Sequence, residues 1–372
     1  MEPIPFFLHD LGEDELAAAA RVIGTPLLTT GPVTAEFERG FSDLLGAGHT
    51  VAVASCTAGL HLALEGLGVG PGDEVIVPDM TFAASALAVQ HAGATPVLVD
   101  VRPDDGTIDL AAVRAAIGPR TAAVMPVHLY GQLCDMRGIA DLAGRHGLAV
   151  VEDAAHCIEG ERDGVVPGGL GDAACFSFYA TKNMTCGEGG AVVTRHDELA
   201  ATLRRSRTHG MDRTAADRIR DGYTPWDIVR PGWKYNLDDV RAAMLIPQLP
   251  WVRERLERRA ALARLYDAAF AEAPLISTPV RTGRHAHHLY PVWIEGGRRN
   301  GCMAALTEAD IGWTVNYTPV SGLSAFAGLA RVPDGFPVSR SIAARTLSLP
   351  MYPRLTAAQA ERVAERVLAG VA

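Results

Sequence analysis

Short apolar runs rich in β-branched residues alternate with Ala/Leu-rich stretches between residues 49 and 194. The runs are TVAVAS (50–55), EVIVPD (74–79), TPVLVDV (95–101), AAVMPVHL (122–129), LAVVEDA (148–154), ACFSFY (174–179) and GAVVT (190–194). Stretches with helical character lie between the first five runs, at 57–66, 83–92, 109–117 and 135–146. This alternation is typical of a mostly parallel sheet with helices on both faces. The sequence therefore predicts an α/β fold.

The pattern changes twice towards the C-terminus. Ten residues separate the last two runs, too few for a helical crossover, so these two strands are expected to be antiparallel. Residues 237–270 indicate a helix interrupted near Pro247 and Pro250. Because 372 residues exceed a typical single core, we predict a large domain over 1–250 and a smaller α+β domain over 251–372. The last segment, TAAQAERVAERVLAGV, indicates an amphipathic helix with a Thr N-cap.

Composition excludes several classes of protein. A net charge of −9 and a pI near 5.7 argue against a general nucleic-acid-binding surface. No apolar run reaches the length of a membrane helix, and the N-terminus lacks the features of a signal peptide. The six cysteines are scattered without a C-x-x-C pair, as expected for reduced thiols. We therefore expect a cytoplasmic protein that contacts neither membrane nor nucleic acid.

Polar and aromatic residues follow several of the predicted strands, where ligands of parallel α/β sheets bind. Ser55 and Thr57 start a helix, whose free N–H groups would favour an anion, although plain N-capping is an alternative. Phe82 starts the next helix and could belong to the core or lie over a flat ligand. Asp153 ends an apolar strand and should meet a cation, either in a ligand or in an arginine, with His156 as a nearby donor.

The segment CFSFYATKNMTCGEGG adds Ser177 and Lys182 to this set. Lys182 precedes a glycine-rich reversal, Gly187–Gly190, that leads into the next strand. Lysine is rare here, because the 34 basic residues include only two lysines, Lys182 and Lys234. A lysine amine can lose its proton and condense with an aldehyde, whereas a guanidinium cannot. An accidental surface lysine is the alternative.

An anion site, an aromatic ring, a buried carboxylate and an amine together describe a pocket for pyridoxal 5′-phosphate (PLP). The helix start and Ser177 would hold the phosphate. Asp153 would keep the pyridine nitrogen protonated, so that the ring accepts electrons. Lys182 would form the Schiff base with the cofactor and then carry protons once a substrate amine displaces it.

These motifs resemble the DegT/DnrJ/EryC1/StrS family of PLP-dependent sugar aminotransferases. The resemblance runs through TTGPVTAEFERGF, PDMTFAASALAVQHAGATPVLVDV, PVHLYGQLCDM, VEDAAHCIEG, SFYATKNMTCGEGGAVVT, RTHG, GWKYNLDDVRAAM and LSLPMYP. It implies the fold of aspartate aminotransferase, the fold type I of PLP-dependent transferases, and a homodimer whose active site lies at the subunit interface.

The resemblance also implies a role for each candidate residue. The phosphate would bind Ser177 and the backbone amides of Thr57 and Ala58. Phe82 would stack on the ring, Asp153 would pair with its nitrogen, and His156 would lie near its hydroxyl. Lys182 would be the catalytic residue, bonded to the cofactor.

The chain departs from the family pattern at several positions. The family commonly has G-F-N-Y-R where this chain has GWKYN, so that Lys234 replaces Asn and Asn236 replaces Arg. We expect Lys234 to reach across the dimer to the cofactor phosphate or the substrate. Asn316 and Ser321 stand where the family often has His, on the sugar-nucleotide side.

Two weaker signals remain. HAHH (285–288) could suggest a metal, but no Cys or carboxylate cluster supports one, and His288 is interpreted as structural or substrate-facing. Glu188 is either a turn residue or a border of the pocket.

These observations predict an aminotransferase that takes nitrogen from a donor, by resemblance L-glutamate, and passes it to a nucleotide-linked keto-deoxysugar for aminosugar synthesis. One alternative is an aminocyclitol aminotransferase that acts on a keto-inositol. A PLP-dependent sugar dehydratase is disfavoured, because such relatives replace the reactive lysine with histidine. A non-catalytic regulatory relative would not need the amine of Lys182.

Overall fold

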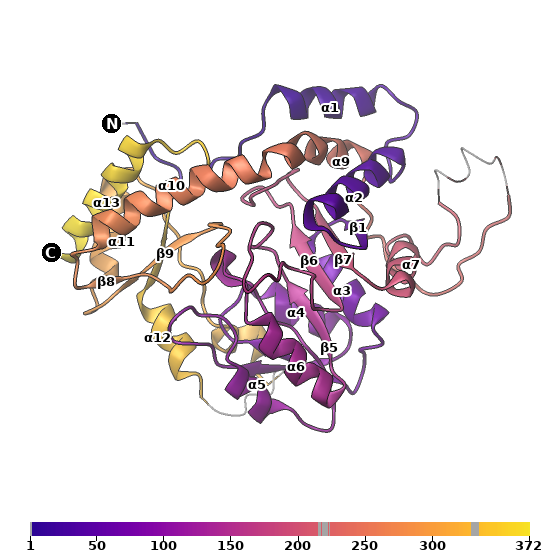
Figure 1. The fold of residues 1–372 in the computed structure, drawn as a ribbon, viewed down its shortest axis with the longest axis horizontal. Helices are drawn as coiled ribbons and strands as arrows, with labels where there is room; N and C mark the ends of the chain where they lie inside the picture. The colour runs from indigo at the N-terminus through magenta and orange to yellow at the C-terminus, as the bar shows by residue number, and fades with distance from the viewer. Residues whose placement is uncertain (1, 215–216, 218–221, 223, 329–334) are drawn as a thin grey trace.

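The computed structural model describes residues 2–214, 217, 222, 224–328 and 335–372, and a seven-stranded sheet lies at its centre (Figure 1). The strand order is β1-β7-β6-β5-β4-β2-β3, and β7 is antiparallel to both of its neighbours, whereas the other pairs are parallel. The predicted mostly parallel sheet and the antiparallel pairing of the last two strands are confirmed. The strands are β1 (His49–Val53), β2 (Glu74–Pro78), β3 (Thr95–Val99), β4 (Thr121–Val124), β5 (Ala149–Asp153), β6 (Ala173–Ser177) and β7 (Gly190–Thr194).

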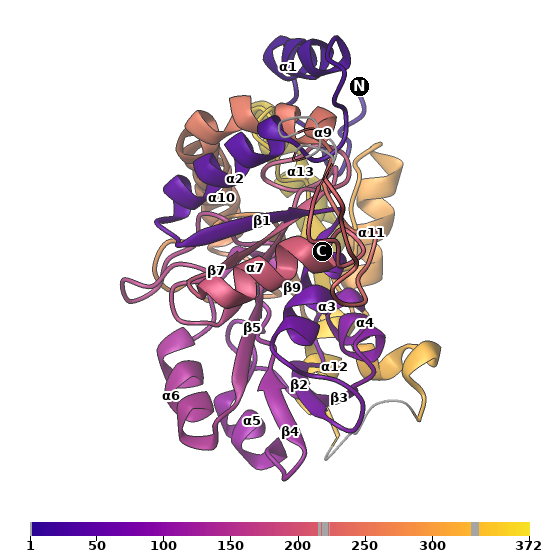
Figure 2. The same cartoon turned by 90° about the vertical axis from the view of Figure 1, so that its right-hand side faces the viewer.

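Helices cover both faces of this sheet, as the apolar strands predict (Figure 2). Side chains of successive strand residues point to opposite faces. Val51 and Val53 therefore pack with α3, α4 and α7, whereas Ala52 packs with α2 and α9 on the other face. The helices around the sheet are α2 (Pro32–Leu45), α3 (Cys56–Gly66), α4 (Ala84–His91), α5 (Leu110–Ala116), α6 (Met136–His146), α7 (Asp197–Ser206) and α9 (Asp239–Leu245), with the short η1 (Leu129–Gly131).

A long helical segment connects the sheet to the C-terminal elements (Figure 1). It consists of α9, the 3-10 helix η2 (Ile246–Trp251) and α10 (Val252–Phe270). The 3-10 turn contains Pro247 and Pro250, which cannot donate the backbone hydrogen bonds of a continuous α-helix. The predicted interruption is confirmed. The N-terminal helix α1 (Glu13–Ile23) packs beside α9.

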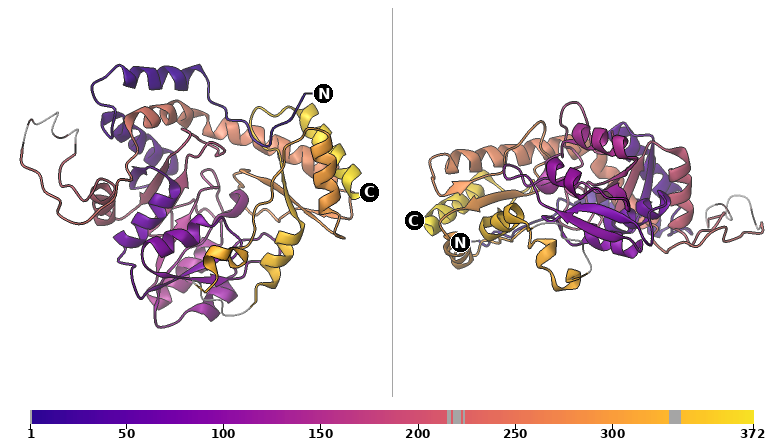
Figure 3. Two further views of the ribbon diagram at one scale, coloured as in Figure 1. Left: turned by 180° about the vertical axis from the view of Figure 1, so that it is seen from behind. Right: turned by 90° about the horizontal axis from the view of Figure 1, so that it is seen from below.

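The C-terminal elements form a second hydrophobic core around a three-stranded sheet of order β10-β9-β8. Ile4 packs into this core and pairs with Ile311, so both chain ends lie on this side of the molecule (Figure 3). The division at residue 250 stays a prediction. Thr356 caps the last helix, as expected, by accepting a hydrogen bond from the Gln359 N–H. The elements are β8 (Ile276–Ser277), β9 (Tyr290–Ile294), α11 (Arg299–Glu308), η3 (Val320–Gly322), η4 (Ser324–Phe326), α12 (Pro337–Arg345), β10 (Thr346–Leu349) and α13 (Ala357–Val371).

The sheet topology gathers the candidate residues at one edge. β1 and β6 both pair antiparallel with β7, so they run in the same direction as each other and as β2, β4 and β5. The carboxyl ends of these strands therefore meet, and Ser55, Asp153 and Lys182 all follow such an end. Among the helices of the described residues, none has both the length and the apolar character needed to cross a membrane.

Candidate active site

A cavity of about 560 Å³ opens at the carboxyl ends of the strands. This volume lies in the range of small-molecule sites. Most of the predicted site residues line it, whereas Ala58 and Lys234 do not. Its lining comprises Ser55, Cys56, Thr57, Leu60, Thr81, Phe82, Ala84, Val127, Asp153, Ala155, His156, Ser177, Tyr179, Thr181, Lys182, Glu188, Gly189 and Tyr317.

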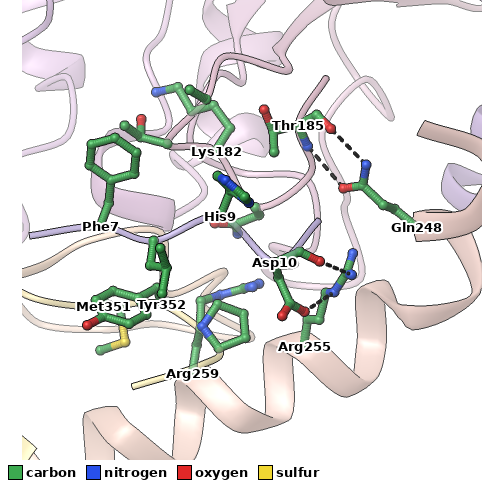
Figure 4. A pocket seen from close by; sticks show the side chains of 15 residues that line it. Phe7, His9, Asp10, Lys182, Thr185, Gln248, Arg255, Arg259, Met351 and Tyr352 are labelled. Atoms are coloured by element: carbon green, nitrogen blue, oxygen red, sulfur yellow. Dashed lines mark hydrogen bonds and ion pairs between the residues drawn. The ribbon is translucent and has the colours of Figure 1, made fainter. Parts of the chain in front are cut away.

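The turn that carries Lys182 is held by its own backbone and by η2. The Lys182 N–H donates to the Tyr179 carbonyl at 2.9 Å. Gln248 is buried, accepts a hydrogen bond from the Thr185 N–H at 3.1 Å and donates one to the Thr185 carbonyl at 2.7 Å (Figure 4). A second pocket borders Lys182 in this view, but its volume of about 30 Å³ leaves room for roughly one water molecule. The large cavity is therefore the candidate site.

Glycine at the start of β7 brings the turn close to α3. A Cβ on Gly190 would lie 2.5 Å from the Ser55 carbonyl carbon and 2.6 Å from the Cys56 nitrogen, both backbone atoms. Any larger residue would push the strand away from the helix start. Gly187 has a φ of +83°, which favours glycine in the same reversal. The GEGG segment thus places Lys182 and the start of α3 in one cavity.

The environment of Lys182 makes its amine a reactive group. Burial lowers the pKa of Lys182 to about 8 from its ordinary value of 10.5, although the negative charge of Asp153 acts in the opposite direction. At pH 7 roughly a tenth of the amine is therefore neutral and nucleophilic, a far larger fraction than an ordinary lysine has. Burial and Asp153 raise the pKa of the neighbouring Cys56 thiol, so this thiol stays protonated and is a poor nucleophile.

Asp153 is buried and forms no salt bridge with a side chain of the described residues, although it interacts electrostatically with Lys182 at longer range. Its carboxylate accepts hydrogen bonds from the Ser85 hydroxyl at 2.7 Å and from the Ala155 N–H at 3.1 Å. The alternative of a salt bridge to an arginine is therefore not seen within the described part of the chain. A buried carboxylate without a cation is costly, so this geometry suits a ligand that brings a positive charge, such as a protonated pyridine nitrogen.

Phe82 lies on the cavity wall with 61% of its surface exposed. Its ring centroid is 5.9 Å from that of Tyr317, with a tilt of 48° between the planes. The alternative that Phe82 belongs to the core is wrong. An exposed ring inside a cavity offers an apolar face to a flat ligand.

The start of α3 offers free N–H groups to an anion, but not all of those predicted. The Ser55 hydroxyl oxygen accepts a hydrogen bond from the Ala58 N–H at 3.1 Å, so Ser55 is an N-cap, as the alternative interpretation predicted. Among the described residues, the N–H groups of Cys56 and Thr57 have no acceptor. Ser177 is buried nearby, and its hydroxyl oxygen accepts the Tyr179 N–H at 3.3 Å. A phosphate at this place would meet two free amides and a hydroxyl group.

His156 has a fixed orientation at the side of the cavity. Its Nδ1 accepts the Tyr130 N–H at 3.3 Å, and its Nε2 lies 3.0 Å from the Tyr317 hydroxyl. Burial, aided by the charge of Lys182, lowers the pKa of His156 well below its usual value. The neutral ring therefore carries its hydrogen on Nε2 and donates to Tyr317. His156 lines the cavity and bonds to Tyr317 in this structure, and its predicted contact with the cofactor stays a prediction.

Lys234 lies apart from the cavity of its own chain. Its side chain is exposed in a surface hollow that Asn236 and Arg241 also line. Asn236 donates to the Thr30 hydroxyl at 2.7 Å. The predicted contact of Lys234 with a cofactor therefore stays a prediction that needs a second subunit.

The remaining candidates are Ser321 and the histidines of the HAHH segment, and most of them bond to or contact other residues of the protein outside the cavity. Ser321 is not among the residues that line the cavity, and it bonds through both N–H and hydroxyl to Asp79, which directly follows β2. His285 and His287 contact each other with ring centroids 4.7 Å apart. In the described part of the chain, no group of three or more His, Cys, Asp or Glu side chains could hold a metal. His288 instead turns towards Lys182, with Nε2 3.4 Å from the Lys182 Nζ.

Sequence reasoning missed three residues of this site. Ser85 holds Asp153, Tyr317 bonds to His156, and Asn183 contacts His288. Ser85 lies in the first turn of α4, three residues after Phe82, and its place at the helix start could have indicated it. Asn183 directly follows Lys182. Tyr317 had no signal of its own, because a long C-terminal connection brings it to the cavity.

Comparisons with known proteins agree with this geometry. The sequence profile of the DegT/DnrJ/EryC1/StrS aminotransferase family matches residues 9–368. The spore coat polysaccharide biosynthesis protein SpsC of Bacillus subtilis (strain 168) is 39% identical over 373 residues, which are 98% of this chain and 96% of SpsC.

Two solved structures are similar over nearly the whole chain. DesV of S. venezuelae, solved in complex with a ketimine intermediate, is 40% identical with a TM-score of 0.89, covering 96% of this chain and 94% of DesV. The PLP form of the sugar aminotransferase Spr1654 from Streptococcus pneumoniae, described as putative, is 30% identical with a TM-score of 0.93, covering 100% and 99%. The chain belongs to the DegT/DnrJ/EryC1/StrS aminotransferase family and is a PLP-dependent aminotransferase of fold type I.

Proposed function

We propose that this aminotransferase moves an amino group from L-glutamate to a nucleotide-linked keto-deoxysugar, in a step of aminosugar synthesis. The observation that carries the proposal is the amine of Lys182, which has a lowered pKa and lies in one cavity with the buried carboxylate of Asp153. The relatives support the sugar class, since SpsC is named for polysaccharide synthesis and Spr1654 is described as a putative sugar aminotransferase.

Residues of the cavity fit the cofactor one part at a time. Asp153 would hold the ring nitrogen, Phe82 one face of the ring, and His156 the ring hydroxyl. The phosphate would bind Ser177 and the free N–H groups at the start of α3, with the Ala58 amide joining if Ser55 releases it. Bound there, the cofactor supplies an aldehyde that condenses with amines and a ring that takes up electrons.

Lys182 is the proton carrier in this scheme. With cofactor and substrate bound, the free amine of Lys182 would take a proton from the substrate carbon that bears nitrogen and deliver it to the cofactor carbon that had carried the aldehyde. In the second half of the reaction it would move a proton in the opposite direction. A pKa of about 8 suits both directions, because the protonated and neutral forms coexist near neutral pH. Asp153 keeps the positive charge of the ring nitrogen in place while this proton moves.

A second copy of the chain would complete the site. Among the described residues that line the cavity, Lys182 is the one lysine or arginine, so the cofactor phosphate meets no further cation from its own chain. Lys234 is exposed beside Trp233, which is 39% exposed. We assign the missing charge to Lys234 of the partner subunit, in a homodimer with two shared sites.

The six cysteines, all unpaired, suit a cytoplasmic location.

The test is spectroscopic and needs only purified protein. The PLP form should be yellow, lose this absorbance when L-glutamate is added, and regain it with the right keto acceptor. A panel of nucleoside-diphosphate-linked ketosugars and free keto-cyclitols separates the sugar from the cyclitol function. Recovery with a keto-inositol alone would refute the nucleotide-sugar assignment, and a protein that never binds PLP would favour the regulatory alternative.

A further inference from the structure

A chain of buried polar contacts leads from the amine of Lys182 into the protein. The Lys182 Nζ lies 3.4 Å from His288 Nε2, and His288 Nδ1 lies 3.1 Å from Asn183 Oδ1. The Asn183 amide nitrogen donates to Glu159 at 2.9 Å, and Glu159 is paired with Arg259 at 2.5 Å. None of the last three residues belongs to the cofactor contacts described above.

The ion pair at the buried end of this series of contacts determines which atom donates and which accepts in each hydrogen bond. Glu159 and Arg259 are almost completely buried and form an ion pair, so the Glu159 carboxylate only accepts hydrogen bonds. The Asn183 amide nitrogen donates both to Glu159 and to the Ala286 carbonyl, the latter at 3.1 Å. The amide oxygen of Asn183 must therefore face His288. Because an amide oxygen only accepts, His288 Nδ1 must carry a hydrogen.

His288 is neutral in this environment. Burial lowers its pKa well below the usual value, and the positive charge of Lys182 acts in the same direction. The other ionisable groups that face it are His156, Arg259 and His285, and each of them also disfavours a second positive charge. A neutral imidazole has one ring hydrogen, here on Nδ1, so the lone pair of Nε2 points at the Lys182 amine.

We propose that Asn183 and His288 are positioning residues for the catalytic amine. Asn183 holds His288 in the Nδ1–H tautomer, and His288 Nε2 accepts one hydrogen of the Lys182 amine whenever that amine is not bonded to the cofactor. The remaining hydrogens of the ammonium form, and the lone pair of the neutral form, are then directed to the cavity. The inference rests on the proposed role of Lys182 as proton carrier. The opposite tautomer would set two acceptors, the Nδ1 lone pair and the Asn183 amide oxygen, against each other across 3.1 Å.

The tautomer itself can be measured without any assay of activity. The full-length protein is labelled with ¹⁵N-histidine and loaded with pyridoxamine phosphate, which leaves Lys182 unbonded. The His288 signals are assigned by their loss in His288→Gln. We expect hydrogen on Nδ1 and a lone pair on Nε2. A ring with its hydrogen on Nε2 overturns the proposal, even if the protein is a fully active aminotransferase.

Asn183→Ala tests the origin of the tautomer. We expect His288 to change to the Nε2–H form, and kcat with L-glutamate to fall roughly tenfold at unchanged KM, because one orienting hydrogen bond is lost. Asn300→Ala, at an exposed position of α11, is the matched control and should change neither the tautomer nor kcat.

An unaltered Nδ1–H form in Asn183→Ala refutes the role of Asn183. Should Asn183→Ala fail to fold, the wild-type spectrum still decides the tautomer. A protein that shows the Nδ1–H form but no transamination would refute the proposed function and not the tautomer.

Discussion

The two lysines of this chain occupy opposite kinds of environment. Lys182 is partly buried in a turn that Gln248 holds, and it faces Asp153 across the cavity. Lys234 is exposed in a segment whose backbone pairs with Thr208 at the surface. A single chain therefore contains the residues that orient Lys182 and lower its pKa, whereas its second lysine, Lys234, lies outside the same cavity.

The difference has a simple physical reason. An amine that reacts must lose its proton readily, and burial away from water achieves this. A residue that neutralises a phosphate needs only a full positive charge, which solvent exposure preserves. Substitutions at Lys182 or Asp153 test the buried, reactive amine, and a substitution at Lys234 tests the exposed charge.

The largest effect is expected at Lys182. Lys182→Ala removes both the group that bonds the cofactor and the proton carrier, and should lower the transamination rate by roughly 10⁴-fold or more. Lys182→Arg keeps the positive charge but not the amine chemistry, and should be just as inactive. The rate with L-glutamate is measured by loss of the PLP absorbance. An active Lys182→Arg enzyme would show that charge alone matters here.

Asp153→Asn should have the next largest effect. The amide keeps the shape of the side chain but removes the negative charge that holds the ring nitrogen protonated, so kcat should fall by roughly 10²–10³-fold. Asp163→Asn is the matched control, since the Asp163 side chain is 61% exposed and should tolerate the change. Equal rates for the two variants would contradict the assignment of Asp153.

Lys234→Ala should weaken the enzyme by roughly tenfold, because a charge-assisted contact to the phosphate is lost. Complementation sharpens this test. A refolded equal mixture of Lys182→Ala and Lys234→Ala chains should recover about a quarter of the wild-type rate, since half of the dimers are mixed and each has one intact site. A mixture no more active than Lys234→Ala diluted twofold would mean that Lys234 does not act across the interface.

The smallest effect concerns pH. The rate at which the cofactor-free protein captures PLP should rise with pH and level off above about 8, because the neutral amine of Lys182 is the attacking form. The same lowered pKa has a stability effect of defined sign. Between pH 8 and 10.5 the unfolded chain keeps the proton that the folded chain has lost, so folding becomes more favourable as pH rises. Capture that levels off only near pH 10.5 would contradict the activated amine.

Much of this architecture could be predicted from the sequence, because strand direction controls where strand ends meet. The antiparallel β7, the interruption at Pro247 and the gathering of Asp153 and Lys182 all follow from local pattern and chain connectivity. The exposure of Phe82 required the structure, because the helix start alone is equally compatible with a core position.

Contacts made through long connections could not be predicted. Tyr317 lines the cavity and His288 contacts Lys182, and both lie more than 100 residues after Lys182 along the chain. N-capping by Ser55 and anion binding are alternatives that the sequence could not decide between, because both use the same amides; the structure shows the cap on the Ala58 N–H. The place of Lys234 depends on a second subunit.

The amine of Lys182, and not that of Lys234, is expected to bond the cofactor. Borohydride reduction of the PLP-loaded protein, followed by proteolysis and mass spectrometry, tests it directly. The account predicts a phosphopyridoxyl group on the peptide that contains Lys182, and none after Lys182→Ala. The same label on the peptide that contains Lys234 in the wild-type protein would contradict it.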